Sequence, residues 1–273
     1  ITAIAGFIIA ALIFLVVRDK PSWVTRMPKS YHSWKHTWKR VFELLKMWRF
    51  WINGIVGACL FMPVSVFASL WGVAFLIGSY HLSATESATA ASLVFIGAAV
   101  GSPIAGWFSD LIQNRRLLLF IGTLATTGLS LVLIYISGLS PITVLILLFL
   151  IGVFAGPQIL VFAIAREISP PRSTGISTAS TNFIVTLSAA IFQPLIGYLL
   201  TLHWTGTLTA SGTPNYTNAD YRFSLFVIPA ALFIAFFMIA LFDHYLWSML
   251  SFAILWLGLP AMLIDNTAPS PVS

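Results

Sequence analysis

Six long apolar runs, separated by short polar connections, restrict this chain to a small set of folds. They cover residues 50–80, 88–109, 117–136, 142–164, 176–202 and 223–242. About 20 apolar residues in a helix are enough to cross the hydrocarbon core of a bilayer. Only 8% of the 273 residues are charged, against about a quarter in soluble domains. The sequence therefore predicts an all-α integral membrane protein with several transmembrane helices.

Two further segments flank the six runs. Residues 1–17 are apolar and end at Arg18 and Pro21, which predicts the end of a transmembrane helix that begins in a longer parent sequence. Residues 244–273 form an atypical apolar tail, for which an extra span, an interfacial segment and an altered reading frame all stay open. Within the first full run, Pro63 predicts a kink.

Basic residues are concentrated in alternate connections. Residues 18–49 and the connections around Arg115 and Arg166 hold 13 of the 14 Lys and Arg residues, and positive residues near span ends stay on the cytoplasmic side. These connections are therefore predicted to be cytoplasmic, and charges that border a membrane argue against nucleic acid as a partner. Trp34, Trp38 and Phe42 recur at helical spacing between lysines, which predicts an amphipathic helix on the membrane surface within the basic linker 18–49.

Three local motifs accompany this arrangement. The first is Gly106, Asp110, Arg115 and Arg116 in the connection between the second and third runs. The second is Arg166-Glu167 to Pro170-Pro171-Arg172, followed by Gly175 and Asn182, and the third is Trp71-Gly72 with Phe75-Leu76. The chain resembles the middle and second half of a major facilitator superfamily transporter, with 50–243 as its six-span carboxy-terminal bundle and a preceding span and linker helix. It is also distantly similar to nutrient permeases of intracellular bacteria.

The resemblance assigns a gating role to the loop motif. Gly106 is expected to let two helices approach closely, and Asp110 to accept hydrogen bonds from the amino terminus of a neighbouring helix. Arg115 and Arg116 are expected to meet anionic groups. Leu111, Gln113 and Asn114 depart from the family pattern, which more often has a basic residue, a glycine and another basic residue there.

The resemblance also implies that the first, second, fourth and fifth full spans border a central cavity. Trp71, Gln158, Asn182 and Gln193 are polar residues within those spans and become the candidate substrate-binding residues. Gln158 follows Gly156-Pro157, a backbone interruption of the kind that lines transporter sites. Structural hydrogen bonding between helices is an equally good explanation for each amide, and packing or interfacial anchoring is the alternative for Trp71.

These observations predict a secondary active transporter, a permease or symporter that moves a small polar solute such as an amino acid or nucleoside by alternating access. The expected partners are the lipid bilayer, the solute and the missing amino-terminal half, and the expected location is a bacterial inner membrane. No enzymatic, cofactor or metal motif is found, although proton coupling through a carboxylate of the missing half is expected if the parent is coupled like many relatives. The alternative is a structural remnant without transport activity.

Overall fold

The computed structural model describes residues 2–16, 34–170, 173–208, 212 and 214–242. The chain forms two compact units, residues 1–39 and 40–273. The first unit contains α1 (Thr2–Val16) and the beginning of α2 (Trp34–Leu45), and the second contains a helical bundle. Most of the linker 18–49 before Trp34, and the tail 244–273, lie outside the described residues, so the predictions for those stretches stay predictions.

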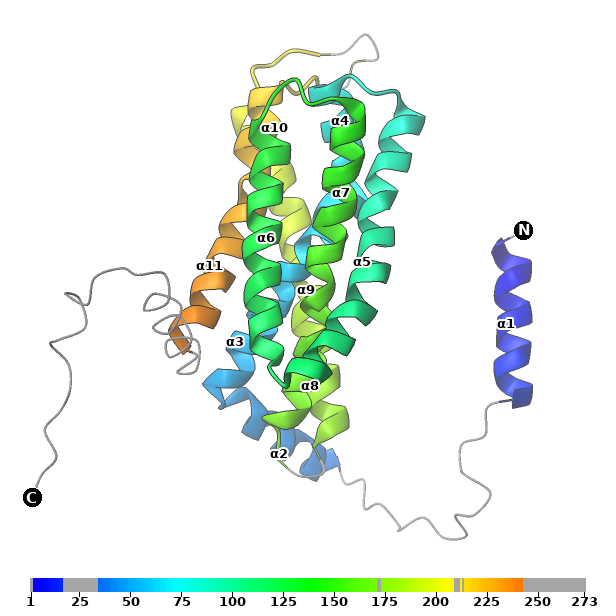
Figure 1. The fold of residues 1–273 in the computed structure, drawn as a ribbon, viewed down its shortest axis with the longest axis vertical. Coiled ribbons are helices and arrows are strands. Elements are labelled where there is room, and N and C mark those ends of the chain that lie inside the picture. Colours follow the sequence, from blue (N-terminus) through cyan, green and yellow to red (C-terminus); the bar gives the residue numbers. More distant parts are fainter. Residues whose placement is uncertain (1, 17–33, 171–172, 209–211, 213, 243–273) are drawn as a thin grey trace, which may run out of the picture. The chain divides into compact units, whose positions relative to one another are not determined.

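The bundle contains the six predicted spans (Figure 1). In the described part of the chain, six helices are long and apolar enough to cross a membrane: 48–80, 84–112, 115–135, 141–167, 174–203 and 218–240. They comprise α3 (Trp48–Met62) with η1 (Pro63–Trp71) and α4 (Gly72–Tyr80); α5 (Ala84–Ile112); α6 (Arg115–Tyr135); α7 (Pro141–Ala155) with η2 (Gly156–Ile159) and α8 (Leu160–Glu167); α9 (Thr174–His203); and α10 (Asn218–Leu225) with α11 (Val227–Phe242). The predicted all-α membrane fold is confirmed.

Side-chain caps explain where several of these helices begin. Ser83 and Glu86 form a capping box at the start of α5, and Thr217 and Asp220 form another at the start of α10. The Asn114 side chain caps α6, and Ser140 caps α7. Each cap satisfies backbone N–H groups that have no partner within the helix. These four caps define where their helices begin, whereas α3 and α9 begin without a side-chain cap.

Prolines interrupt three of the spans. Pro63 begins the π-helical segment η1, and Gly156-Pro157 begins the 3₁₀ turn η2. Pro229 lies in the first turn of α11, next to the break between α10 and α11 at Phe226. A proline has no N–H to donate to the preceding turn, so the helical hydrogen-bond pattern changes at each point. The interruption predicted at Gly156-Pro157 is confirmed. At Pro63, where a kink is predicted, the span changes to π-helical form and continues.

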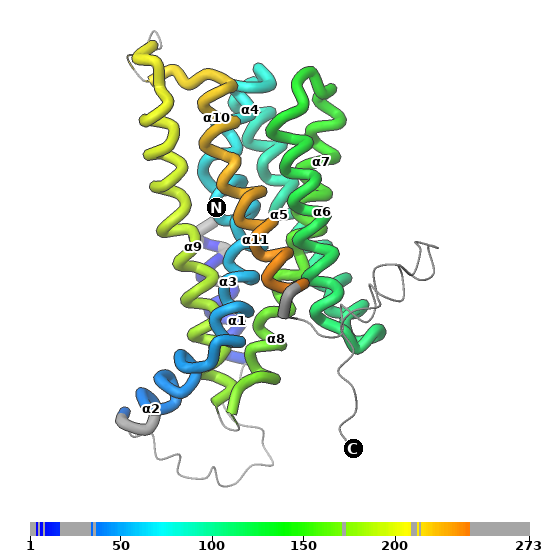
Figure 2. Tube along the Cα trace, turned by 90° about the vertical axis from the view of Figure 1, so that its left-hand side faces the viewer, coloured from blue at the N-terminus to red at the C-terminus, as the bar shows by residue number. Residues whose placement is uncertain are grey.

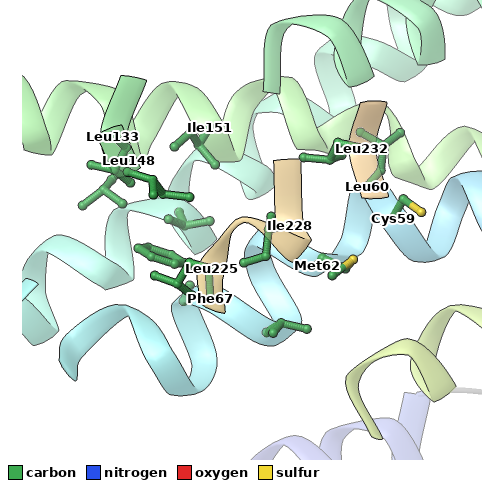
Figure 3. Packing of buried hydrophobic residues seen from close by; sticks show 14 of the residues in the cluster. Cys59, Leu60, Met62, Phe67, Leu133, Leu148, Ile151, Leu225, Ile228 and Leu232 are labelled. Atoms are coloured by element: carbon green, nitrogen blue, oxygen red, sulfur yellow. The ribbon is translucent and has the colours of Figure 1, made fainter. Parts of the chain in front are cut away.

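The apolar core of the bundle draws residues from all six spans, and Figure 3 shows the part among α3, η1, α6, α7, α10 and α11. Leu60, Phe67, Leu148, Leu225 and Leu232 are among its buried side chains. Figure 2 shows α9 at one side of the bundle and α6 with α7 at the other, and α9 packs mainly against α3, α8 and α10.

A crossing of α5 and α7 brings the two backbones into contact. Gly97 and Gly101 of α5 face Gly152 of α7 and Gly156 of η2, and a Cβ atom added at any of the four would lie less than 3.0 Å from backbone atoms of the other segment. Small residues at four-residue spacing allow such close packing of membrane helices. This contact fixes the second span against the fourth.

Candidate functional site

A polar cluster joins η1 to α9 within the bundle. The Trp71 indole N–H donates to the backbone oxygen of Gln193 at 3.1 Å. The Gln193 amide donates to the backbone oxygen of Ser65 at 2.6 Å and lies 3.3 Å from the Ser69 hydroxyl, which itself donates to Ser65. Two of the predicted binding residues, Trp71 and Gln193, are therefore brought together, and both are engaged in bonds between helices.

The π-helical segment shapes this cluster. π-Helical turns are rare and recur at functional sites, and here the Ser65 backbone oxygen accepts bonds from both Gln193 and Ser69. The Trp71 ring packs beside Gly197, one turn beyond Gln193, where an added Cβ would lie 3.2 Å from the ring. The cluster thus anchors η1 on α9 and holds the Trp71 ring half-buried.

One face of α9, here called the polar face, consists of Thr178, Asn182, Thr186 and Gln193, which recur at helical spacing. Asn182 and Thr186 are exposed, and none of the described residues is hydrogen bonded to the Asn182 side chain. A neighbouring sector of the same helix exposes Phe183, Leu187, Ile191 and Tyr198. The exposed surface of α9 is therefore divided into a polar sector and a large apolar sector, and the apolar sector suits contact with lipid.

Gln158 occupies a different position. It lies half-buried on η2, between α7 and α8, and none of the described residues is hydrogen bonded to its side chain. The backbone oxygen of neighbouring Gly156 accepts a 3.2 Å bond from Ser102 of α5. Gln158 is thus an amide on an interrupted helix, and among the described residues it shares no hydrogen bond with the Trp71–Gln193 cluster.

The loop motif lies at the end of the bundle where α5 meets α6 and α8 ends, here called the basic end. Arg115 forms a 2.9 Å ion pair with Glu167, and both side chains are partly exposed. Asp110 and Arg116 line a cavity of about 490 Å³ together with Arg115 and Glu167. Gln113 ends α5 in the left-handed conformation, which makes the tight turn between the two helices.

The close helix contact expected at Gly106 is not made among the described residues. No described heavy atom lies within 4 Å of a Cβ atom built there, so Gly106 makes no close helix contact. Gly106 is half-buried, whereas Gly97 and Gly101 lie on the side of α5 that packs against α7. The Asp110 carboxylate is exposed and accepts no hydrogen bond from the described residues, so its predicted contact with a helix amino terminus is likewise not made here.

Comparison with known proteins decides the family. A family model described as Major Facilitator Superfamily matches residues 1–193 and, in a second register, residues 54–241. The chain belongs to the major facilitator superfamily. Overlapping matches in two registers suit a family whose two halves are structural repeats.

A curated relative gives a more distant comparison. The chain is 28% identical over 143 residues to the membrane sensor protein UhpC of Escherichia coli (strain K12), which is 50% of this chain and 32% of that protein. The aligned region thus spans about a third of the length of the relative. Together, the superfamily match and the six apolar helices make this chain a multi-pass membrane protein of a transporter family.

Sequence reasoning missed the polar contacts at the other end of this superfamily bundle. The Asp220 side chain is 1% exposed, pairs with His203 Nδ1 at 2.6 Å and accepts bonds from Thr217. Arg222 donates to the backbone oxygen of Ile134 at 3.1 Å and so caps the end of α6. The capping-box spacing of Thr217 and Asp220 was a readable signal, but the His203 contact depends on the tertiary fold.

Proposed function

We propose that this chain supplies one half of the solute pathway of a secondary transporter, which moves a small polar solute by alternating access. The polar face of α9 is the main support. Exposed amide and hydroxyl groups on a membrane helix are costly against lipid and are placed in a bundle interior or a water-filled cavity. The polar face therefore suits a pathway wall, formed with α5, the α3–η1 span and the span of α7, η2 and α8 that contains Gln158.

The chemistry of the wall favours a neutral or zwitterionic solute. Asn182, Thr186 and Gln158 are uncharged donors and acceptors, and the polar face contains no Lys or Arg. A multiply charged solute would need such charges in the pathway. An amino acid or a nucleoside fits this wall, with Asn182 and Gln158 as the binding amides and Trp71 as an aromatic surface held by Gln193.

Coupling to protons is a separate part of the proposal. Asp220 pairs with His203 and caps α10, and this gives it a structural role. The titrating carboxylate of a proton-coupled parent is therefore expected in the other half of the transporter. Uptake by the full-length parent that does not change with pH would remove this part and leave the rest intact.

A binding-only role is a second candidate, because the matched relative is named a membrane sensor protein. A sensor would bind its solute at the same wall without moving it across the membrane. Equilibrium binding without accumulation in vesicles would favour this function, and neither binding nor uptake for any solute would favour a structural remnant.

Uptake into proteoliposomes tests the proposal. Radiolabelled amino acids and nucleosides are supplied to vesicles that hold this chain alone, or this chain with the amino-terminal half of its parent. We expect uptake only with both halves. Asn182→Ala should reduce it about tenfold, because one hydrogen bond to a bound solute is lost. The matched control is Phe183→Ala on the adjacent apolar sector, and equal losses in both variants would contradict the assignment of the polar face.

A further inference from the structure

A second cavity at the basic end has a different composition from the first. It encloses about 110 Å³ between the beginning of α3, the beginning of α6, the end of α8 and α11. Arg49 and Arg116 are its basic residues, and Asn53 is its amide. The rest of the lining is apolar and includes Leu119, Met238 and Ile239. The cavity therefore combines cationic groups with an aliphatic wall.

Asn53 provides a polar group deep within this cavity. Its side chain is 7% exposed, and its amide nitrogen donates to the backbone oxygen of Val161 at 2.8 Å. None of the described residues donates to its amide oxygen. Asn53 lies one helical turn after Arg49, so an acceptor oxygen follows the guanidinium along the same face of α3. This suits a ligand whose anionic group is joined to a hydroxyl-bearing or hydrated part.

Helix termini add to the positive potential of the cavity. Both α3 and α6 begin here, and helix amino termini carry partial positive charge. Met47 gives α3 no side-chain cap, and the first-turn N–H group of Phe50 donates to the Met47 backbone oxygen at 3.0 Å. The described residues that line this cavity include no Asp or Glu, and Glu167 at the same end is paired with Arg115. The site is thus organised for an anion.

Tryptophans locate the cavity at headgroup depth. Trp48 lines it and is 52% exposed, its ring lying 5.6 Å from the Arg49 guanidinium carbon. Trp51, on the next turn, is also exposed and donates to the backbone oxygen of Leu45 at 2.8 Å. Tryptophan is enriched at the membrane–water interface, and basic pockets between transmembrane helices bind phospholipid headgroups.

We propose that this cavity binds the phosphate headgroup of an anionic phospholipid from the leaflet at the basic end. The phosphate contacts Arg49 and Arg116, a hydroxyl of the headgroup donates to the Asn53 amide oxygen, and the upper part of one acyl chain follows Met238 and Ile239. The apolar wall favours a lipid over a free phosphate, since a small hydrated anion gains nothing from aliphatic contact. This site is independent of the proposed solute pathway.

Native mass spectrometry of the purified chain tests the proposal, with phosphatidylglycerol, phosphatidylcholine and glycerol phosphate as probes. We expect retention of phosphatidylglycerol over phosphatidylcholine, and loss of that preference by about 30-fold in R49Q/R116Q, at about 1 kcal/mol for each arginine near a membrane surface. The matched control R166Q removes an exposed arginine of the same end that is outside the cavity lining, and it should keep the preference. R49K should also keep most of it.

Cavity filling separates a lipid from a free anion. Met238→Trp leaves both arginines in place and fills the apolar wall, so it should weaken phosphatidylglycerol retention without affecting any binding of glycerol phosphate. The proposal is overturned if the two lipids are retained equally by the unmodified chain, if R49Q/R116Q keeps the preference, or if glycerol phosphate competes as well as the lipid. Circular dichroism of each variant checks that helical content is unchanged.

Discussion

Amide side chains in this bundle occupy three environments. Gln193 bonds across to η1, Asn53 bonds to the backbone of α8, and Asn182 is exposed on α9. All three look alike in the sequence, as single polar residues within apolar runs. Their separation into structural and exposed groups depends on which helix lies opposite each one. The sequence therefore identified the amides as candidate binding residues but did not show which are structural and which are exposed.

Replacing Gln193 with Ala should destabilise the bundle by about 1–2 kcal/mol, because two contacts to η1 are lost and polar bonds between membrane helices contribute about 0.6 kcal/mol on average with larger values in some cases. Thermal unfolding in detergent, followed by circular dichroism, measures the change. Asn182→Ala, on the same helix and without a described bond, should unfold at the temperature of the unmodified chain. Equal destabilisation of both variants would show that the Gln193 contacts to Ser65 and Ser69 contribute nothing.

Among the helical elements, the crossing of α5 and α7 is the contact that tolerates least change. Four glycines allow backbone contact there, whereas Gly106 on the same helix and Gly128 on α6 face open space. The four-residue spacing of Gly97 with Gly101, and of Gly152 with Gly156, was readable in the sequence. The loop motif predicts a close approach at Gly106 instead, where no described atom lies within 4 Å of an added Cβ atom.

Gly101→Ala and Gly152→Ala should each destabilise the bundle by about 1–3 kcal/mol, because the added methyl group must force the two helices apart in a packed interior. Gly128→Ala is the control and should be neutral or slightly stabilising, because alanine favours helix by about 1 kcal/mol over glycine. Folded yield after detergent extraction and the unfolding temperature report the difference. A Gly101→Ala protein as stable as Gly128→Ala would show that the crossing can relax.

The two ends of the whole bundle are held by different kinds of interaction. Away from the basic end, Arg222 caps α6, the Tyr80 hydroxyl donates to the backbone oxygen of Leu133 at 2.7 Å, and His203 pairs with buried Asp220. At the basic end, the described contacts include the exposed Arg115–Glu167 pair and two cavities. Exposed ion pairs contribute at most about 1 kcal/mol, and Asn53 adds one buried bond to Val161 there. We therefore expect the basic end to open more easily than the other.

Hydrogen exchange measured by mass spectrometry should show this asymmetry. We expect slower exchange in the last turn of α6 than in the last turn of α8. Arg222→Gln should accelerate exchange near Ile134 and leave the beginning of α6 at its original rate, whereas Arg115→Gln should change exchange little at either end. Uniform acceleration along α6 in Arg222→Gln would indicate that Arg222 supports the whole fold and not one end.

The prediction of fold succeeded at this scale because the bilayer imposes it. Any chain with six apolar runs of this length must satisfy its backbone polar groups within helices. The number and type of the spans therefore follow from the pattern of apolar runs along the sequence. The polar pairing of Asp220 with His203 and the π-helical form of η1 do not follow in this way. The Asp220–His203 pair depends on a contact between two spans whose residues are more than ten positions apart in sequence. The form of η1 depends on the hydrogen bonds around Pro63.

Unequal span lengths have a consequence for the membrane that this protein suits. The shortest span contains 21 residues and the longest 33. At the α-helical rise these correspond to about 32 Å and at most about 50 Å, since nine residues of the longest span are π-helical. A hydrocarbon layer near 30 Å matches the shortest span without distortion, and the longest one must lean or extend into the headgroups. The length of span 115–135 therefore indicates the hydrocarbon thickness that this protein matches. The longer helices exceed that thickness and are expected to tilt.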